Sequence, residues 1–326
     1  MRPIRITNKI KGSFESLIDS ELLKPDSVLS IAKNKIIDLN NNINASLQER
    51  AALLEITTDF KKFILYSPTE QALFIAKCIG ISPLLFYDPA LGRIKTTPFG
   101  RNIITALNYD GFRPEYADKI TLATGLKTCP YCNAALTIVT TRKNGQKKSL
   151  FQLDHFYPKA RYPLFCISFF NLIPSCGNCN NSKRDNDVTL VEDFHLFADE
   201  THSEGYRFEI PKDNVARYLV SNDLNYITID FVPGSDGNVK NTNHHDESFN
   251  IKGLYETQKD VIEELFWKAK AYPDERIEEL SNLLKLPDSV IRRMVIGNYI
   301  DKEDIHKRPL SKFQQDIARQ LGLIKK

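Results

Sequence analysis

The sequence predicts a mainly α protein of the α+β class, with a small metal-stapled module at its centre. Apolar residues recur at helical spacing in both outer parts of the chain. Between them lie a β-branched run, an Asn-Gly turn signal and two Cys-x-x-Cys pairs. These features divide the chain into a helical region 1–126, a central module 127–190 and a mixed strand and helix region 191–326.

Length and composition are those of an ordinary globular chain. The 326 residues leave room for about two domains, and 42% apolar with 26% charged residues can form a buried core. No run approaches the ~18 apolar residues of a membrane span, and the first residues lack the apolar stretch of a secretory signal. We therefore expect a cytoplasmic protein without a membrane partner.

Helices are expected in the first region because apolar residues recur there every three to four positions. Pro25 disfavours helical geometry before it, and Asp26 or Ser27 can cap the helix that follows. The expected helices are 14–23, 28–37, 46–65, 68–79, 101–107 and 114–124. Nothing in this region points to catalysis, and we expect it to pack or to bind a partner.

The central region changes to strand character after Thr128. Residues 135–141 are rich in β-branched side chains, and Asn144-Gly145 predicts a hairpin turn before a returning strand over 149–153. A short helix is expected after Cys179. The aromatic residues at 165, 169 and 170 are expected to pack in the core.

The last region mixes strands with helices. Strands are expected at 207–210 and 226–231, followed by a turn cluster at 233–238. Helices are expected at 251–271, 274–284, 288–300 and 311–321. His244 and His245 are expected to be surface residues of a polar loop, outside any site.

The two cysteine pairs predict a structural zinc site. Cys129 and Cys132 form the first pair, and Cys176 and Cys179 form the second. Four thiolates in two such pairs suit one tetrahedral Zn²⁺, which then has no open coordination position for catalysis. Two unrelated pairs of buried cysteines, or a redox couple, are the alternatives.

Positive charge is concentrated around these pairs. Residues 127–185 carry nine basic and two acidic residues, a net charge of +7, whereas residues 186–326 carry 19 basic and 26 acidic residues, a net of −7. A basic patch is the electrostatic footprint of a surface that binds polyphosphate, although a solvated patch has the same composition.

Between the cysteine pairs the chain reads Asp-His-Phe-Tyr-Pro-Lys at 154–159 and Asn-Leu-Ile-Pro-Ser-Cys at 171–176, and then Cys-Asn-x-x-Lys at 179–183. In this order, the motifs of residues 129–185 resemble the HNH endonuclease family with its ββα-metal finger. Within that family they are most similar to the HNH nucleases of bacterial anti-phage systems such as Septu.

The resemblance implies a role for each matching residue. His155 is the general base that takes a proton from the attacking water, which suits an imidazole. Asp154 and Asn180 bind the catalytic Mg²⁺ or Mn²⁺, ions that prefer oxygen ligands. Asn171 fixes the loop and orients His155. Asn181 could replace Asn180 with a shift of one residue.

The resemblance also implies a nucleic-acid substrate, with DNA favoured over RNA, and a partner ATPase of a defence complex. Backbone phosphates are expected to contact four basic residues: Lys159, Arg161, Lys183 and Arg184. Two alternatives remain, a nuclease that cuts RNA such as tRNA, and a zinc-stapled binding or scaffold protein without catalysis.

Overall fold

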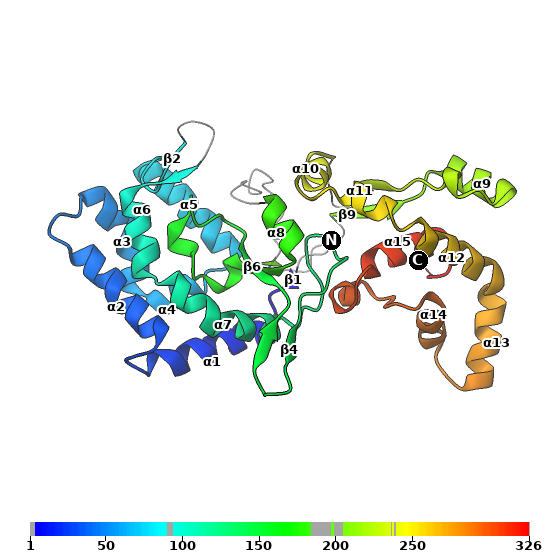
Figure 1. Ribbon diagram of the computed structural model, residues 1–326, viewed down its shortest axis with the longest axis horizontal. Coiled ribbons are helices and arrows are strands. Elements are labelled where there is room, and N and C mark those ends of the chain that lie inside the picture. Colours follow the sequence, from blue (N-terminus) through cyan, green and yellow to red (C-terminus); the bar gives the residue numbers. More distant parts are fainter. Residues whose placement is uncertain are drawn as a thin grey trace. The chain divides into compact units, whose positions relative to one another are not determined.

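The computed structural model describes residues 4–89, 94–183, 197–198, 205–235, 237 and 239–325 (Figure 1). Within them the chain is mainly helical, with two-stranded sheets of which all but one are antiparallel, so the predicted mainly α, α+β class is confirmed. None of the described helices is both long and apolar enough to cross a membrane.

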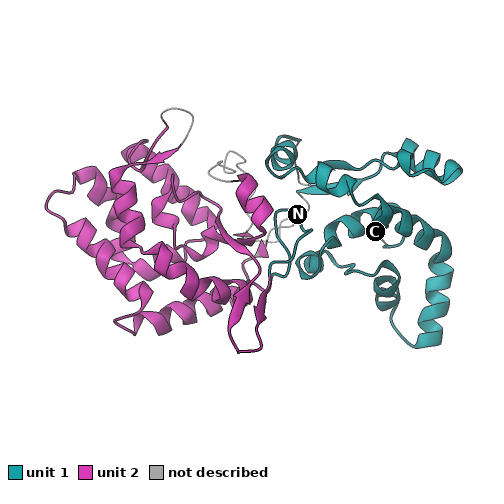
Figure 2. Cartoon of the chain, viewed as in Figure 1, with its two compact units in different colours: residues 1–2, 126–137, 202–326 teal, residues 3–125, 138–201 magenta. Residues whose placement is uncertain are grey.

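The chain forms two compact units, each built from segments that are discontinuous in sequence (Figure 2). Unit 2 contains residues 3–125 and 138–201, and unit 1 contains residues 1–2, 126–137 and 202–326. The units therefore do not coincide with the three consecutive regions expected from the sequence. The segment that carries the first cysteine pair belongs with the C-terminal residues rather than with the second pair.

The N-terminal helices of unit 2 include all those expected. They are α1 (Asn8–Leu22), α2 (Val28–Asn41), α3 (Leu47–Thr58), α4 (Phe60–Ile64), α5 (Pro68–Ile81), α6 (Pro98–Ala106) and α7 (Tyr109–Thr124). Of these, α1, α6 and α7 begin three to six residues earlier than expected. Ser46 and Ser67 form capping boxes with Glu49 and Glu70, which satisfy the first free N–H groups of α3 and α5. Asp59 ends α3 and caps α4, so the single helix expected over 46–65 is in fact two.

An aromatic core joins these helices to the loop that precedes the second cysteine pair. Phe169 packs against Phe14 of α1 and Phe112 of α7, with ring centroids 4.9 and 5.8 Å apart. Phe165 stacks on Phe63 of α4 at 5.6 Å. The expected packing role of these aromatic residues is confirmed, and the core fixes the loop they flank.

Short strands of unit 2 pair in small sheets. β4 (Val139–Thr141) pairs with β5 (Lys147–Ser149), and β6 (Gln152–His155) pairs with β7 (Leu172–Ser175), both antiparallel. Two further pairs are β2 (Tyr87–Asp88) with β3 (Lys95–Thr96), and β1 (Ile4–Arg5) with the parallel β8 (Phe197–Ala198). The 3-10 turns η2 (Pro163–Phe165) and η3 (Phe169–Asn171) precede β7, and α8 (Gly177–Lys183) follows it.

The Asn-Gly signal marks a hairpin, as expected, and the loop between Arg142 and Gln146 has three residues. Gly145 has φ +82°, which a glycine adopts without strain, and Gln146 O accepts from Arg142 N at 2.8 Å to close the loop. Asn144 is not in the left-handed region. The turn is therefore the type I form followed by a left-handed residue.

Unit 1 combines one antiparallel pair of strands with helices. β9 (Tyr206–Glu209) pairs with β10 (Asp230–Pro233). The helical elements are α9 (Lys212–Ser221), η5 (Leu224–Tyr226), α10 (Val239–Phe249), α11 (Ile251–Glu256), α12 (Lys259–Ala271), α13 (Asp274–Leu284), α14 (Asp288–Ile296), η6 (Lys302–Lys307) and α15 (Ser311–Gln320). Phe208, Tyr255 and Phe313 pack together at its centre, with ring centroids 4.4 to 5.3 Å apart.

The expectation that His244 and His245 lie in a polar surface loop is wrong. Both residues belong to α10, and His245 is buried. Its ring stacks on Tyr206 at 5.0 Å, and its Nε2 lies 2.9 Å from the backbone oxygen of Tyr131. The helix escaped prediction because its sequence is polar and rich in asparagine, with few apolar residues to define a face.

Candidate active site

The last two residues of β6 and the helix α8 line one cavity of about 540 Å³ within unit 2. Asp154 pairs with Ile173 of β7 and His155 pairs with Leu172, so the sheet fixes both backbones. Asp154, His155, Lys159 and Asn180, all predicted site residues, line the cavity together. Two antiparallel strands followed by a helix thus bring them to one place.

His155 is held as a neutral imidazole in a defined orientation. Its Nε2 lies 3.0 Å from the backbone oxygen of Cys166, and because a carbonyl can only accept, Nε2 carries the proton. Burial is the main cause that lowers the pKa of His155, to about 3. The Nδ1 atom is therefore left as a proton acceptor. An anion in the cavity would oppose the shift, since negative charge favours the imidazolium.

Asn171 fixes the loop that carries the Cys166 carbonyl. It is fully buried, and its Oδ1 accepts a hydrogen bond from Tyr157 N at 2.7 Å. Its Nδ2 donates to the backbone oxygens of Tyr157 and Phe165 at 3.2 and 3.0 Å. One side chain thus ties together the two ends of the loop from 157 to 165. Asn171 can position His155 without touching the cavity.

Asp154 is neutralised by a buried lysine. Lys183, the last residue of α8, is fully buried, and its Nζ lies 2.9 Å from Asp154 Oδ2 and 3.2 Å from Oδ1. Lys183 also donates to the backbone oxygen of His155. The prediction that Lys183 contacts backbone phosphates is wrong for this structure, because its ammonium group has no exposed surface and binds the carboxylate instead.

The other metal ligand expected in the cavity is an amide. Asn180 on α8 donates from Nδ2 to Gln152 Oε1 at 2.6 Å, so its own Oδ1 stays available as an oxygen ligand. Asn181 also lines the cavity. The alternative between Asn180 and Asn181 therefore remains open in the geometry.

The basic residues predicted to contact phosphates have different positions. Lys159 lines the cavity, with its Nζ 4.6 Å from the ring centroid of Tyr109. The guanidinium of Arg161 lies 4.8 Å from the ring centroid of Tyr87 and lines a separate apolar cavity beside Cys78. Arg184 lies outside the described residues.

Five residues of the cavity wall were not expected from the sequence, and two of them, Tyr109 and Arg113, come from outside the predicted central module. Tyr109 and the exposed Arg113 are one helical turn apart on α7. The N-terminal helices were expected to serve packing or partner binding, and α7 in addition supplies part of this cavity wall. The spacing of four residues could have shown that the two share a helix face, but nothing in the sequence links α7 to β6.

The four cysteines of the predicted zinc site are gathered in one cluster, as expected. The Sγ atoms of Cys129, Cys132, Cys176 and Cys179 all lie within 4.8 Å of one another. Around a tetrahedral zinc with bonds of about 2.3 Å, the sulfurs would be roughly 3.8 Å apart, so the cluster fits the ion.

Backbone groups also favour thiolates at this cluster. Ala134 N lies 3.5 Å from the Sγ of Cys132, and Cys179 N lies 3.5 Å from the Sγ of Cys176. Amides directed at sulfur stabilise its charged form, which is the form that binds metal. The sulfur donors and the cavity's oxygen donors are separate sets, which suit a structural ion and a catalytic ion respectively.

Comparison with known proteins does not assign a family or an activity to the chain. No family model and no solved structure matches the chain. One curated relative is "Protein ea31" of Escherichia phage lambda, which is 35% identical over 80 residues, covering 24% of this chain and 22% of that protein. The chain therefore matches less than a quarter of that relative's length, and the relative's name states no activity.

Proposed function

We propose that the chain is a metal-dependent nuclease of the HNH type that hydrolyses phosphodiester bonds, with DNA as its substrate. The observation that supports this most is the placing of His155 beside Asp154 and Asn180 in one cavity. A neutral imidazole with a free acceptor nitrogen, next to two oxygen donors, matches the needs of a water-activating base and a hard cation.

In this proposal His155 takes a proton from water at Nδ1. The Cys166 carbonyl holds the opposite nitrogen, so the acceptor atom keeps its direction during the transfer. Asn171 maintains the loop that supplies this carbonyl. Arg113 and Lys159 at the cavity wall bind the phosphate and hold the scissile bond near the water.

Asp154 and Asn180 would hold Mg²⁺ or Mn²⁺ in the same cavity. Their oxygen atoms are the ligands such ions prefer, and an ion bound there would share the Asp154 carboxylate with the ammonium group of Lys183. When bound, the ion would supply stabilisation of the charge that develops on the phosphate and leaving oxygen. A role in an anti-phage complex with a partner ATPase belongs to the same proposal and is supported by the motif resemblance alone.

The proposal is tested by incubating the purified full-length chain with supercoiled plasmid and with a folded RNA transcript. Nicked and linear plasmid are expected when Mg²⁺ or Mn²⁺ is added, and intact plasmid when no divalent ion is added. Intact plasmid under every ion condition, with zinc bound and the protein folded, would exclude this activity for the isolated chain. Cleavage of the transcript alone would reassign the substrate to RNA.

Replacing Lys183 by methionine is expected to lower the free energy of unfolding by about 3–5 kcal/mol without divalent ions, because the buried Asp154 carboxylate loses the ammonium group that neutralises it. Added Mg²⁺ or Mn²⁺ should reduce this loss, since an ion at Asp154 neutralises the same charge. Chemical denaturation of the full chain with and without the ions measures both effects.

Lys312 gives a matched control for this prediction. It forms a buried pair with Asp316 at 2.7 Å and belongs to unit 1, whereas the cavity residues belong to unit 2. Asp316 also lies 3.6 Å from Arg319 and accepts a hydrogen bond from Phe208 N, so Lys312→Met should lower the free energy of unfolding by less, and by the same amount with and without Mg²⁺. Equal ion dependence of the two variants would contradict a cation site at Asp154.

A further inference from the structure

The β4–β5 hairpin of unit 2 is a strongly basic and exposed element that the candidate active site does not use. Residues 141–150 are all exposed, and residues 139–150 contain no aspartate or glutamate. Four cations are present: Arg142, Lys143, Lys147 and Lys148. Within the part of the chain that the structure describes, none of the four forms an ion pair with a carboxylate.

The cations lie on both faces of the hairpin as well as at its tip. Lys147 is paired with Thr141, and Lys148 is paired with Thr140. Successive residues of a strand point to opposite faces, so the two lysines project in opposite directions. Arg142 and Lys143 begin the turn. A ribbon that lies flat on an anionic surface would need positive charge on one face only.

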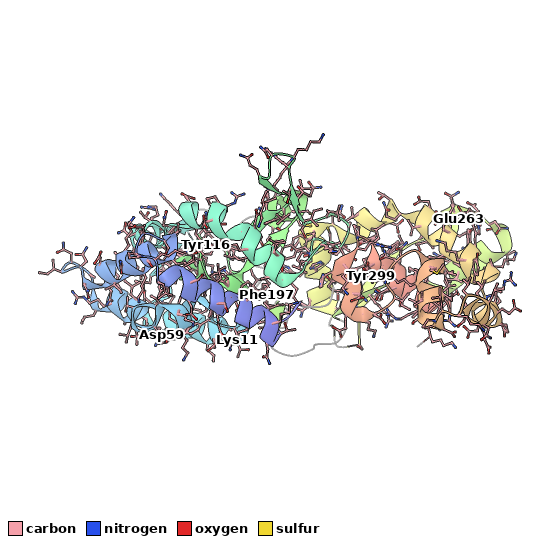
Figure 3. All side chains as sticks on the ribbon, turned by 90° about the horizontal axis from the view of Figure 1, so that it is seen from below. Lys11, Asp59, Tyr116, Phe197, Glu263 and Tyr299 are labelled. Carbon is pink, nitrogen blue, oxygen red and sulfur yellow. The ribbon has the colours of Figure 1, made fainter. Side chains whose placement is uncertain are left out.

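The hairpin is a two-stranded ribbon that projects away from the helices of its unit (Figures 1 and 3). Its tip is closed by hydrogen bonds across the turn, and its base is held by Leu150 N, which donates to Ile138 O at 2.8 Å. Ser149 also donates to Asp118 of α7. The ribbon can therefore enter a partner as a preformed unit, without a large cost in conformational entropy.

A groove of duplex DNA matches this shape and charge. The major groove of B-DNA is about 12 Å wide and admits a two-stranded β-ribbon, with phosphates along both of its edges. The major groove of A-form RNA is too deep and narrow for the same entry. Cations on both faces of a projecting ribbon thus favour B-form DNA over double-stranded RNA.

We infer that the β4–β5 hairpin enters the major groove of duplex DNA and contacts phosphates on both sides of it. The inference deepens the proposed function, on which it rests for its choice of nucleic acid as partner. Six residues separate Lys148 from Asp154, so their Cα atoms are at most about 22 Å apart. Phosphate contacts by the hairpin would position the duplex beside the cavity without specifying its sequence.

The test measures binding of a fluorescent duplex of arbitrary sequence by the full-length His155→Ala chain, so that cleavage does not interfere. Fluorescence anisotropy over a series of salt concentrations gives the slope of log K against log salt. Lys147→Gln and Lys148→Gln, each alone, should reduce the magnitude of this slope by about 0.9 and weaken binding on the order of five- to tenfold near 0.1 M salt. The double variant Arg142→Gln/Lys143→Gln should reduce the magnitude of the slope by more than either single variant does.

Lys33→Gln/Lys35→Gln is the matched control, because these two exposed lysines lie on α2 of the same unit. It should leave the slope unchanged. A slope that changes with only one of Lys147 and Lys148 would overturn entry into a groove, and equal hairpin dependence with double-stranded RNA would overturn the choice of B-form DNA. Thermal denaturation checks that each variant is folded.

Plasmid cleavage by the chain with His155 intact, measured beside duplex binding, separates this inference from the proposed nuclease activity. A chain that binds duplex through the hairpin but never cuts plasmid contradicts the nuclease and supports the hairpin's role. A chain that cuts plasmid with unchanged efficiency and salt dependence after loss of all four cations contradicts the hairpin's role and supports the nuclease.

Discussion

Alanine in place of His155 is expected to reduce cleavage of plasmid DNA by about 10²–10⁴-fold, because the nitrogen that accepts the proton from water is lost. Binding of duplex should change little, since the cavity's cations, Arg113 and Lys159, remain. Single-turnover cleavage with enzyme in excess measures the rate, and anisotropy measures the affinity. A variant that retains the wild-type rate would exclude His155 as the base.

Two further variants separate catalysis from folding. His155→Gln retains an amide N–H that can donate toward the Cys166 carbonyl but has no nitrogen able to accept a proton, so it should be folded and inactive. His245→Gln is the matched control, because His245 is also buried, with its pKa likewise lowered to about 3 and with a backbone oxygen as partner. Its folded fraction should cleave at nearly the wild-type rate.

Serine in place of Cys129 is expected to abolish stoichiometric zinc binding and to lower the melting temperature sharply. Structural zinc in small sites contributes an apparent 10–16 kcal/mol of binding free energy, roughly, and this is coupled to folding. Metal analysis of the purified chain and thermal denaturation give the two results. Full zinc occupancy in Cys129→Ser would contradict a site made of the four cysteines.

Cys78→Ala provides the control for zinc. Cys78 is also a buried thiol, but it lies on α5 and is not part of the cysteine cluster, and burial raises its pKa to about 12. The variant should retain one zinc ion per chain and lose only the free energy of a small packing defect, on the order of 1 kcal/mol. Loss of zinc in both variants would point to general unfolding rather than to removal of a ligand.

Local signals in the sequence predicted most helices because each depends on its own residues. Ser46 and Ser67 cap α3 and α5, and Gly297, with φ +80°, ends α14 before the predicted boundary. The break between α3 and α4 was not predicted, because the single residue Asp59 both ends the first helix and caps the second. α10 escaped because its composition is that of a loop.

Contacts between residues that are far apart in the sequence were the part of the site that the sequence could not predict. The spacing of the cysteines predicted their cluster, whereas the motif resemblance implied that Asp154, His155 and Asn180 belong to one site, and these three do line one cavity. Lys183 was expected at the surface because an isolated lysine in a polar helix is usually solvated. Its burial depends on Asp154, 29 residues away, and only the folded chain shows that pairing.

Because unit 1 is discontinuous in sequence, its parts leave the ribosome at widely separated times. Asn133 accepts a hydrogen bond from Lys312 N, and 179 residues separate the two. At a synthesis rate of about 5–20 residues per second, the segment with the first cysteine pair waits roughly 10 to 40 s for α15 to leave the ribosome. During that interval Cys129 and Cys132 lack their C-terminal neighbours in unit 1, so this unit can complete its packing around the first cysteine pair only after α15 has been synthesised.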